Sequence, residues 1–368
     1  MTRDPKTKSV TGTFLLISVA IVGFAFVDRF LARTERVEGE REAERLYQEG
    51  EQFEKSGDAK HAIDRFRAAL AIADREEYGI ALASALLQAG RPQDAESVVN
   101  ELLQRDSVNA EADLMMARVL VKEGNIPAAA SYYHRAIYDQ WRTEAPRRRL
   151  QVRLELIDLL ALYGKKQELL SELLAVQSEA NGNLTLLKRI APLYLKAGSP
   201  GHASEAFRDI LRSEPHNAEA YSGLGEAEFA EGRYRQAEGN FAAAVRITPQ
   251  DEQAKTRLEL CRRVTQLDPT RRGLSRTDRY RRSVEVLTAA ADDLRECSGA
   301  AATEDIQQLI GLAQKQISQR VSTSKEDDAI EANLNLSEQL WSTRLRTCRQ
   351  TRTPAEQPLA LVLAKISQ

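Results

Sequence analysis

The sequence has 368 residues, of which 42% are hydrophobic and 29% are charged, and its formal net charge is −2. A chain of this composition has enough apolar residues to bury a large core, so disorder over its whole length is excluded. The nearly neutral balance argues against a protein that mainly coats nucleic acid. Three cysteines occur without a CxxC pair, which excludes a disulfide-dense scaffold and a cysteine zinc site.

The first predicted element is an apolar segment near the amino terminus. Residues Val10 to Val27 carry no charge and would span about 27 Å as a helix, close to the roughly 30 Å hydrocarbon core of a bilayer. After a short tail at 1–9, we therefore predict a transmembrane signal-anchor helix at 10–31. A cleaved signal peptide is the alternative, because basic residues precede the segment.

Basic residues on both sides of this segment leave its orientation open. Acidic residues dilute the positive charge on the carboxyl side, which favours an amino end inside the cell. The prediction is a single-pass protein of a bacterial inner membrane, bound to the bilayer through its N-terminal helix, with most of the chain outside the cytoplasm. A charged helical linker at 32–42 would connect this helix to the rest of the chain.

A repeated sequence pattern organises the next part of the chain. Gly198 and Gly232 are separated by the same interval as Phe207 and Phe241. The turn glycines of the successive copies are Gly57, Gly90, Gly124, Gly164, Gly198 and Gly232. A period of this length indicates a solenoid of helix pairs, in which the glycine ends the first helix of each pair.

The spacing within one copy resembles the tetratricopeptide repeat (TPR) signature. In the last copy the matching residues are Tyr221, Leu224, Gly225, Gly232, Ala237, Phe241, Ala244 and Pro249. The resemblance implies an all-α fold in which about six helix hairpins stack between residues 43 and 268. Asp251 to Gln266 would form a helix that caps the apolar end of the stack.

The fourth hairpin departs most from the pattern. The interval between Gly124 and Gly164 is longer than the others, which predicts an extra loop near Arg142 to Arg149. Pro146 would prevent a continuous helix through this loop. The apolar stripe of the hairpin persists without its small residues, at Leu156, Ile157, Leu169 and Leu173.

The repeat is lost after residue 268, and we predict a helical region at 269–368 in which we recognise no family signature. Apolar residues at helical spacing predict three helices and a short apolar tail. The predicted elements are Tyr280 to Cys297, Glu304 to Val321, Ala329 to Cys348 and Leu359 to Ile366. A region of about a hundred residues can form a small domain of its own.

The resemblance implies that other proteins or peptides bind in a groove lined by the first helix of each hairpin. The groove positions carried over from the family are Leu114, Arg118, Lys122, Lys188, Leu195, Ser222, Glu226 and Phe229. The alternative is that these side chains only face water. A subclass of the family clamps the carboxyl terminus of a chaperone, but Tyr47 and Glu51 stand at the first two clamp positions here, which argues against that role.

Two further features of the C-terminal region can each be interpreted in two ways. Six arginines lie between Arg271 and Arg282, and we interpret them as a solvated linker rather than as a contact for anionic lipid or nucleic acid. Cys297 and Cys348 each lie near the predicted carboxyl end of a helix, which allows a disulfide; two buried thiols are the alternative.

No arrangement of residues in the sequence indicates catalysis. The histidines lie on or beside repeat helices, and no Gly-rich phosphate loop, HExxH motif or serine elbow occurs. We therefore predict a membrane-anchored, non-catalytic scaffold for an envelope or secretion complex, with no metal, cofactor, nucleic acid or small-molecule substrate. The alternatives are a cytoplasm-facing adaptor or regulator and an enzyme whose activity resides in the C-terminal helical region.

Overall fold

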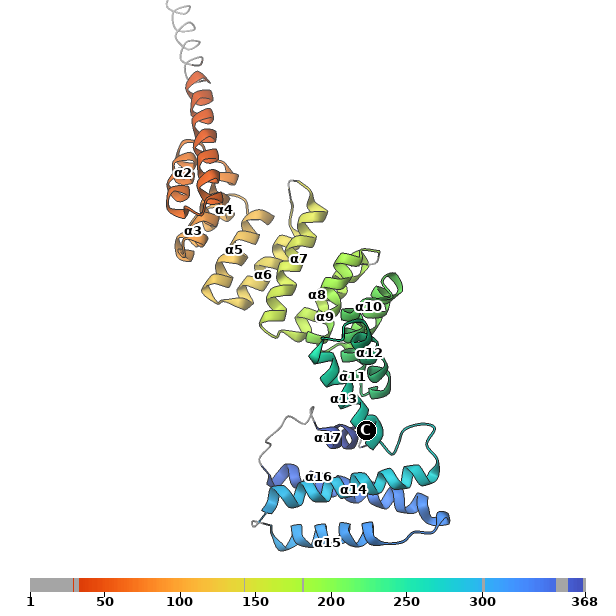
Figure 1. The fold of residues 1–368 in the computed structure, drawn as a ribbon. Coiled ribbons are helices and arrows are strands. Elements are labelled where there is room, and N and C mark those ends of the chain that lie inside the picture. Colours follow the sequence, from red (N-terminus) through yellow and green to blue (C-terminus); the bar gives the residue numbers. More distant parts are fainter. Residues whose placement is uncertain are drawn as a thin grey trace, which may run out of the picture. The chain divides into compact units, whose positions relative to one another are not determined.

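The structure is a computed structural model that describes residues 29, 33–141, 143–180, 182–299, 302–348 and 357–366. Within these ranges the protein is α-helical and forms no β-strand (Figure 1). The chain divides into two compact units, Met1–Leu159 and Leu160–Gln368, and the division falls inside helix α7. The all-α prediction is confirmed for the described part of the chain.

The first unit contains a helix at residues 33–55 and the hairpins that follow it. Its further helices are α2 (Ala59–Ile72), α3 (Glu76–Gln88), α4 (Pro92–Arg105), α5 (Ala110–Glu123), α6 (Ile126–Tyr138) and most of α7 (Ala145–Leu162). Tyr47 stacks on Tyr78 with ring centroids 4.9 Å apart, and the Tyr78 hydroxyl donates to Glu44 Oε2 at 3.1 Å. These contacts join the first helices of two successive hairpins.

The second unit continues the same helix pairs. They are α8 (Lys166–Ala180), α9 (Leu184–Lys196), α10 (Pro200–Ser213), α11 (Ala218–Ala230), α12 (Tyr234–Ile247) and α13 (Glu252–Leu267). Helix α13 packs on α12 through a core that joins Leu258 and Cys261 to Phe241. The predicted capping helix therefore exists, within one residue of its expected bounds.

The predicted turn glycines all adopt the left-handed conformation that a helix-ending glycine provides. Their φ values are 80° at Gly57, 72° at Gly90, 79° at Gly124, 66° at Gly164, 74° at Gly198 and 71° at Gly232. The aromatic residues of the repeat are also equivalent, because all of them are buried: Phe66, Tyr133, Phe207 and Phe241. The repeat read from the sequence is thus present in the fold.

The extra loop before α7 is shorter than predicted. Helix α7 begins at Ala145, inside the range 142–149 that the sequence assigned to the loop. The reason is that Pro146 lies in the first turn of α7, where its missing N–H breaks no helical hydrogen bond. The residue before the helix, Glu144, has a positive φ of 50° and makes the sharp turn into it.

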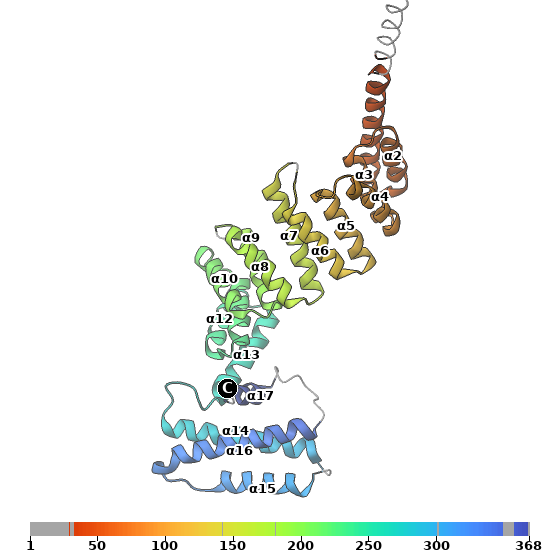
Figure 2. The same cartoon turned by 180° about the vertical axis from the view of Figure 1, so that it is seen from behind.

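The C-terminal region forms the three predicted helices, and the predicted apolar tail is a fourth helix. They are α14 (Arg276–Ser298), α15 (Glu304–Ser318), α16 (Glu326–Thr347) and α17 (Pro358–Ile366), with a 3₁₀ turn at Thr323–Lys325 before α16. Figures 1 and 2 show α14, α15 and α16 side by side from both directions. Their shared core contains Leu287, Leu294, Ile310 and Leu340.

Helices α14 and α16 run in the same direction. Polar contacts join residues at matching positions of the two helices along their whole length. Thr277 Oγ1 lies 3.3 Å from Glu326 at one end. In the middle, Asn333 Nδ2 donates to Ser283 Oγ at 2.9 Å. Further along, Arg344 Nε lies 2.6 Å from Asp293 Oδ2. A buried polar pair and an ion pair therefore fix how the two helices align.

The predicted single-pass membrane localisation is corrected by the structure. Among the described residues, no helix combines the length and the apolar character needed to cross a bilayer. The predicted span at 10–31 lies outside the described residues, apart from Arg29.

Candidate functional site

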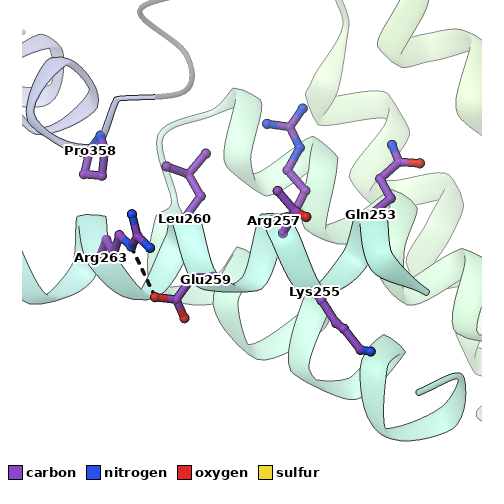
Figure 3. Close-up of a pocket in the computed structure, with 8 residues that line it drawn as sticks. Gln253, Lys255, Arg257, Glu259, Leu260, Arg263 and Pro358 are labelled. Atoms are coloured by element: carbon purple, nitrogen blue, oxygen red, sulfur yellow. Dashed lines mark hydrogen bonds and ion pairs between the residues drawn. The ribbon is translucent and has the colours of Figure 1, made fainter. Parts of the chain in front are cut away.

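A cavity of about 690 Å³ lies along α13 and reaches the start of α17. Figure 3 shows the residues that line it, with Pro358 at the start of α17 facing Leu260 and Arg263 of α13. The lining residues are Gln253, Lys255, Thr256, Arg257, Glu259, Leu260, Arg263 and Pro358. The volume falls in the range of about 300–1,000 Å³ that is typical of ligand sites.

The sequence of α13 separates its two faces. Ala254, Leu258, Cys261 and Val264 recur at spacings of three and four and are buried. Asp251 caps the helix, because its carboxylate accepts a hydrogen bond from the Ala254 amide at 2.9 Å. The residues that line the cavity are therefore held on the opposite face by a well-packed helix.

Three of the cavity residues occupy the repeat positions that the sequence assigned to the groove, one period further along. Thr256 lies one period after Ser222, which lies one period after Lys188. Leu260 follows Glu226, and Arg263 follows Phe229, at the same spacing. These residues are not among the groove positions predicted from the sequence, because α13 is predicted only as a cap. The period of the repeat was the signal that could have found them.

Charged side chains along this face are paired within the protein. Arg257 Nε donates to Glu226 Oε1 on α11 at 2.8 Å, and its guanidinium carbon lies 5.1 Å from the ring centre of Phe229. Arg263 Nε donates to Glu259 Oε1 at 3.2 Å (Figure 3). Carboxylates of the chain therefore already neutralise both arginines of the cavity. The rest of the lining combines apolar and polar side chains.

The predicted groove residues of the first unit lie in different surroundings. Leu114 is buried, and Lys122 is exposed. Arg118 makes a bidentate pair with Glu155 of α7, with its Nε and Nη2 atoms 3.1 and 2.7 Å from the two carboxylate oxygens. Arg118 thus joins the first helices of two neighbouring hairpins.

In the second unit, most of the predicted groove residues also contact the protein itself. Lys188 Nζ donates to Glu214 Oε1 at 2.5 Å, and this hydrogen bond lowers the pKa of the Glu214 carboxyl. Glu226 and Phe229 both contact Arg257 of α13. The remaining two, Leu195 and Ser222, are partly buried, and Ser222 Oγ has no hydrogen-bond partner among the described residues.

A buried carboxyl lies away from this cavity, in the first unit. Asp113 of α5 has no exposed surface, and its Oδ1 atom lies 2.9 Å from Arg135 Nη2 on α6. Burial raises the pKa of Asp113 from 3.8 to about 7; the carboxyl of Asp139 adds to the increase, and Arg135 opposes it. The group therefore titrates near neutral pH.

The cysteines divide into a pair and a single buried thiol. Cys297 and Cys348 are joined in the structure, with Cα atoms 5.9 Å apart at the carboxyl ends of α14 and α16. Burial raises the pKa of Cys261 to about 12, so its thiol is inert. Among the described residues, no group of three histidine, cysteine or carboxylate side chains could hold a metal ion.

Comparison with known proteins agrees with this architecture. Residues 80–145 and 188–252 match the tetratricopeptide repeat family. Together with the helix pairs and their turn glycines, this match shows that the chain carries tetratricopeptide repeats. No protein with a curated description matches the sequence.

Several solved structures resemble the chain in fold. YrrB, described as a TPR protein with an unusual peptide-binding site, is 16% identical with a TM-score of 0.41, over 52% of this chain and 95% of that one. PilW, described as a widely conserved type IV pilus biogenesis factor, is 18% identical with a TM-score of 0.41, over 58% and 97%. The TPR2AB domain of yeast Sti1, in a complex with HSP90, is 17% identical with a TM-score of 0.32, over 74% and 98%.

Proposed function

We propose that the protein is a non-catalytic interaction scaffold that binds an extended segment of another protein on the groove face of α13. One observation carries the proposal: three residues that line the 690 Å³ cavity, Thr256, Leu260 and Arg263, stand at the repeat positions that continue the groove of the preceding hairpins. Helical repeats of this type present extended surfaces, and such surfaces suit extended peptide ligands.

The lining of the cavity indicates the chemistry of the bound segment. Leu260 and Pro358 offer apolar surface, and the exposed Gln253 and Thr256 side chains can form hydrogen bonds with a peptide backbone. Because Arg257 and Arg263 already have carboxylate partners, a charged ligand gains little from them. The preferred segment therefore places an apolar side chain against Leu260 and Pro358.

The role in an envelope or secretion complex that the sequence predicts rests on the membrane span, which the structure corrects. The scaffold is therefore proposed by its binding activity alone.

A library of random twelve-residue peptides displayed on phage tests the proposal directly. Selection on the full chain should enrich peptides with a large apolar residue. Gln253→Trp fills the cavity from the second residue of α13, so each enriched peptide should bind this variant at least about tenfold more weakly, a loss of about 1.4 kcal/mol. Fluorescence anisotropy with the synthetic peptides measures the dissociation constants.

Gln167→Trp is the matched control, because Gln167 is also the exposed second residue of a helix, α8, and lies outside the cavity. This variant should bind the enriched peptides as the original chain does. The proposal is wrong if no peptide is enriched, or if both tryptophan variants bind the enriched peptides with unchanged affinity.

A further inference from the structure

A second cavity, of about 510 Å³, lies where the turn before α12, the end of α13 and the loop that follows it come together. Its lining contains Arg233, Arg235, Arg271, Arg272 and Lys365, with Asp268 as the carboxylate. This cavity shares no lining residue with the cavity on the groove face of α13. The concentration of positive charge sets it apart from the charge-balanced groove.

The carboxylate of this cavity already accepts hydrogen bonds from residues of the protein. Asp268 is almost fully buried, and its Oδ2 atom accepts a hydrogen bond from Lys365 Nζ at 2.5 Å. Its Oδ1 atom accepts from the Thr270 amide and the Thr270 hydroxyl at 2.8 and 2.7 Å. Asp268 therefore balances Lys365, and Arg233 pairs with Glu231. The charges of Arg235, Arg271 and Arg272 remain to be accounted for.

Three arginines of the cavity have no carboxylate partner in the part of the chain that the structure describes. Among the described residues, no carboxylate forms an ion pair with Arg235, Arg271 or Arg272. The Nε atom of Arg271 is buried and donates to no described acceptor. A buried guanidinium nitrogen without a partner is costly, because it has lost water without gaining a hydrogen bond. An anion in the cavity would supply that partner.

Backbone amide groups at the start of α12 also favour an anion in this cavity. Gly232 to Gln236 line the cavity, and this stretch forms the turn and the first residues of α12. The residue that precedes the helix, Arg233, makes no side-chain cap, so the amides of the first turn remain available as donors. A helix amino terminus attracts anions, and phosphate groups in particular, through these amides and the helix dipole.

The arginine run also raises the local positive potential. Arg282 Nη1 donates to the carbonyl oxygens of Thr265 and Asp268 at 2.8 and 3.1 Å, directly behind the loop. Burial lowers the pKa of Arg282, and the positive charges of Arg271 and Arg281 lower it further. The carboxylates of Glu285 and Asp268 oppose this decrease, but the positive charges lie close enough together for their repulsion to be felt.

We propose that this cavity binds a small soluble molecule that carries two or more phosphate groups. Arginine forks hold phosphate oxygens in a bidentate manner, and several of them converge here with an uncapped helix amino terminus. The volume exceeds the need of a single inorganic anion and suits a molecule with a diphosphate group. The site is distinct from the peptide groove and does not depend on the proposed function.

Isothermal titration calorimetry of the full chain with pyrophosphate, at physiological salt, tests this site. The original chain should show saturable binding to one site. The double variant Arg271→Ala, Arg272→Ala removes two uncompensated cations from the loop after α13 and should weaken binding at least tenfold. Arg235→Glu should weaken it as much while keeping α12 folded, because an acidic residue in the first turn suits the helix dipole.

The control is Arg276→Ala, Arg279→Ala, which removes two arginines of the same run that lie outside the cavity, near Asp327. This double variant should bind pyrophosphate within twofold of the original chain. Absence of saturable binding overturns the proposal. An equal loss in the two double variants overturns it as well, because it would show that net charge alone attracts the anion.

Discussion

The ring of Phe241 in α12 fills the space that a side chain at Gly225 of α11 would need. A Cβ atom built on Gly225 would lie 2.9 Å from both Cε1 and Cζ of Phe241. Gly50 and Phe66 have the same relationship in the first hairpin, where the shortest distance is 2.6 Å. In these two hairpins, a missing side chain on the first helix lets the aromatic ring of the second helix pack against the backbone.

We expect Gly225→Ala to destabilise the fold. The added methyl group must displace the buried Phe241 ring, and overpacking of this kind costs about 1–3 kcal/mol. Part of that cost is offset, because alanine favours a helix over glycine by about 1 kcal/mol. Chemical denaturation followed by circular dichroism should therefore show a net loss of up to about 2 kcal/mol in the free energy of unfolding.

Gly239→Ala provides the control for this measurement. Gly239 lies inside α12, and no described atom comes within 4 Å of the position of its added Cβ. This variant should gain about 0.5–1 kcal/mol from helix propensity alone. A Gly225→Ala variant as stable as Gly239→Ala would contradict the packing argument.

The pairing of Gly225 with Phe241 also explains why the repeat fold was predictable from the sequence. A glycine, a small residue and an aromatic residue each have one packing role, and they recur at a fixed period. The turn glycines and the buried aromatic residues were therefore located correctly. The C-terminal helices followed from apolar spacing alone, because helical periodicity needs no family match.

The candidate sites were less predictable, for a reason that Arg118 and Arg257 illustrate. Arg118 reaches Glu155, and Arg257 reaches Glu226, each on a neighbouring helix that is distant in the sequence. Such partners depend on how adjacent hairpins pack, and the spacing within one helix carries no information about it. The run of arginines after residue 270 likewise gave no sign that two of its members would meet Arg235 at one cavity.

We expect Asp113 to make stability depend on pH near neutrality. Its pKa is about 7 in the folded chain and about 3.8 when exposed, so the folded state keeps a proton that the unfolded state releases. The free energy of unfolding should therefore decrease as pH rises from about 4 to about 7, by at most about 1.4 kcal/mol per pH unit for one proton. Urea denaturation at a series of pH values measures this slope.

Asp113→Asn should remove that part of the slope, because the amide is neutral at every pH. Relative to the original chain, the variant should become progressively more stable as the pH is raised toward 8. Asp94→Asn serves as the control, since Asp94 is exposed and pairs with Arg91 on the surface. Parallel pH profiles for the original chain and Asp113→Asn would refute the assignment.

We predict that Cys297 and Cys348 form a disulfide in the protein purified under oxidising conditions. The bond would join residues separated by 51 positions and stabilise the C-terminal helices by about 4 kcal/mol through the loss of unfolded-state entropy. Peptide mapping without reductant should recover the linked pair. Cys297→Ser, Cys348→Ser should lower the midpoint of thermal unfolding, and reductant should lower that of the original chain but not of the variant. Alkylation of both thiols in the unreduced native protein would show that the bond is absent.

The ion pair between Arg344 and Asp293 should contribute more to stability than its neighbours on the surface. The Arg344 side chain is only 6% exposed, so Asp293→Asn leaves a buried guanidinium without its counter-charge. Asp293 itself is 30% exposed, and water therefore moderates the loss to about 2 kcal/mol. Asp292→Asn, which breaks the exposed pair with Arg295, should cost about 0.5 kcal/mol or less. Equal unfolding free energies for the two variants, measured by chemical denaturation, would mean that Arg344 remains solvated and does not set the register of α14 against α16.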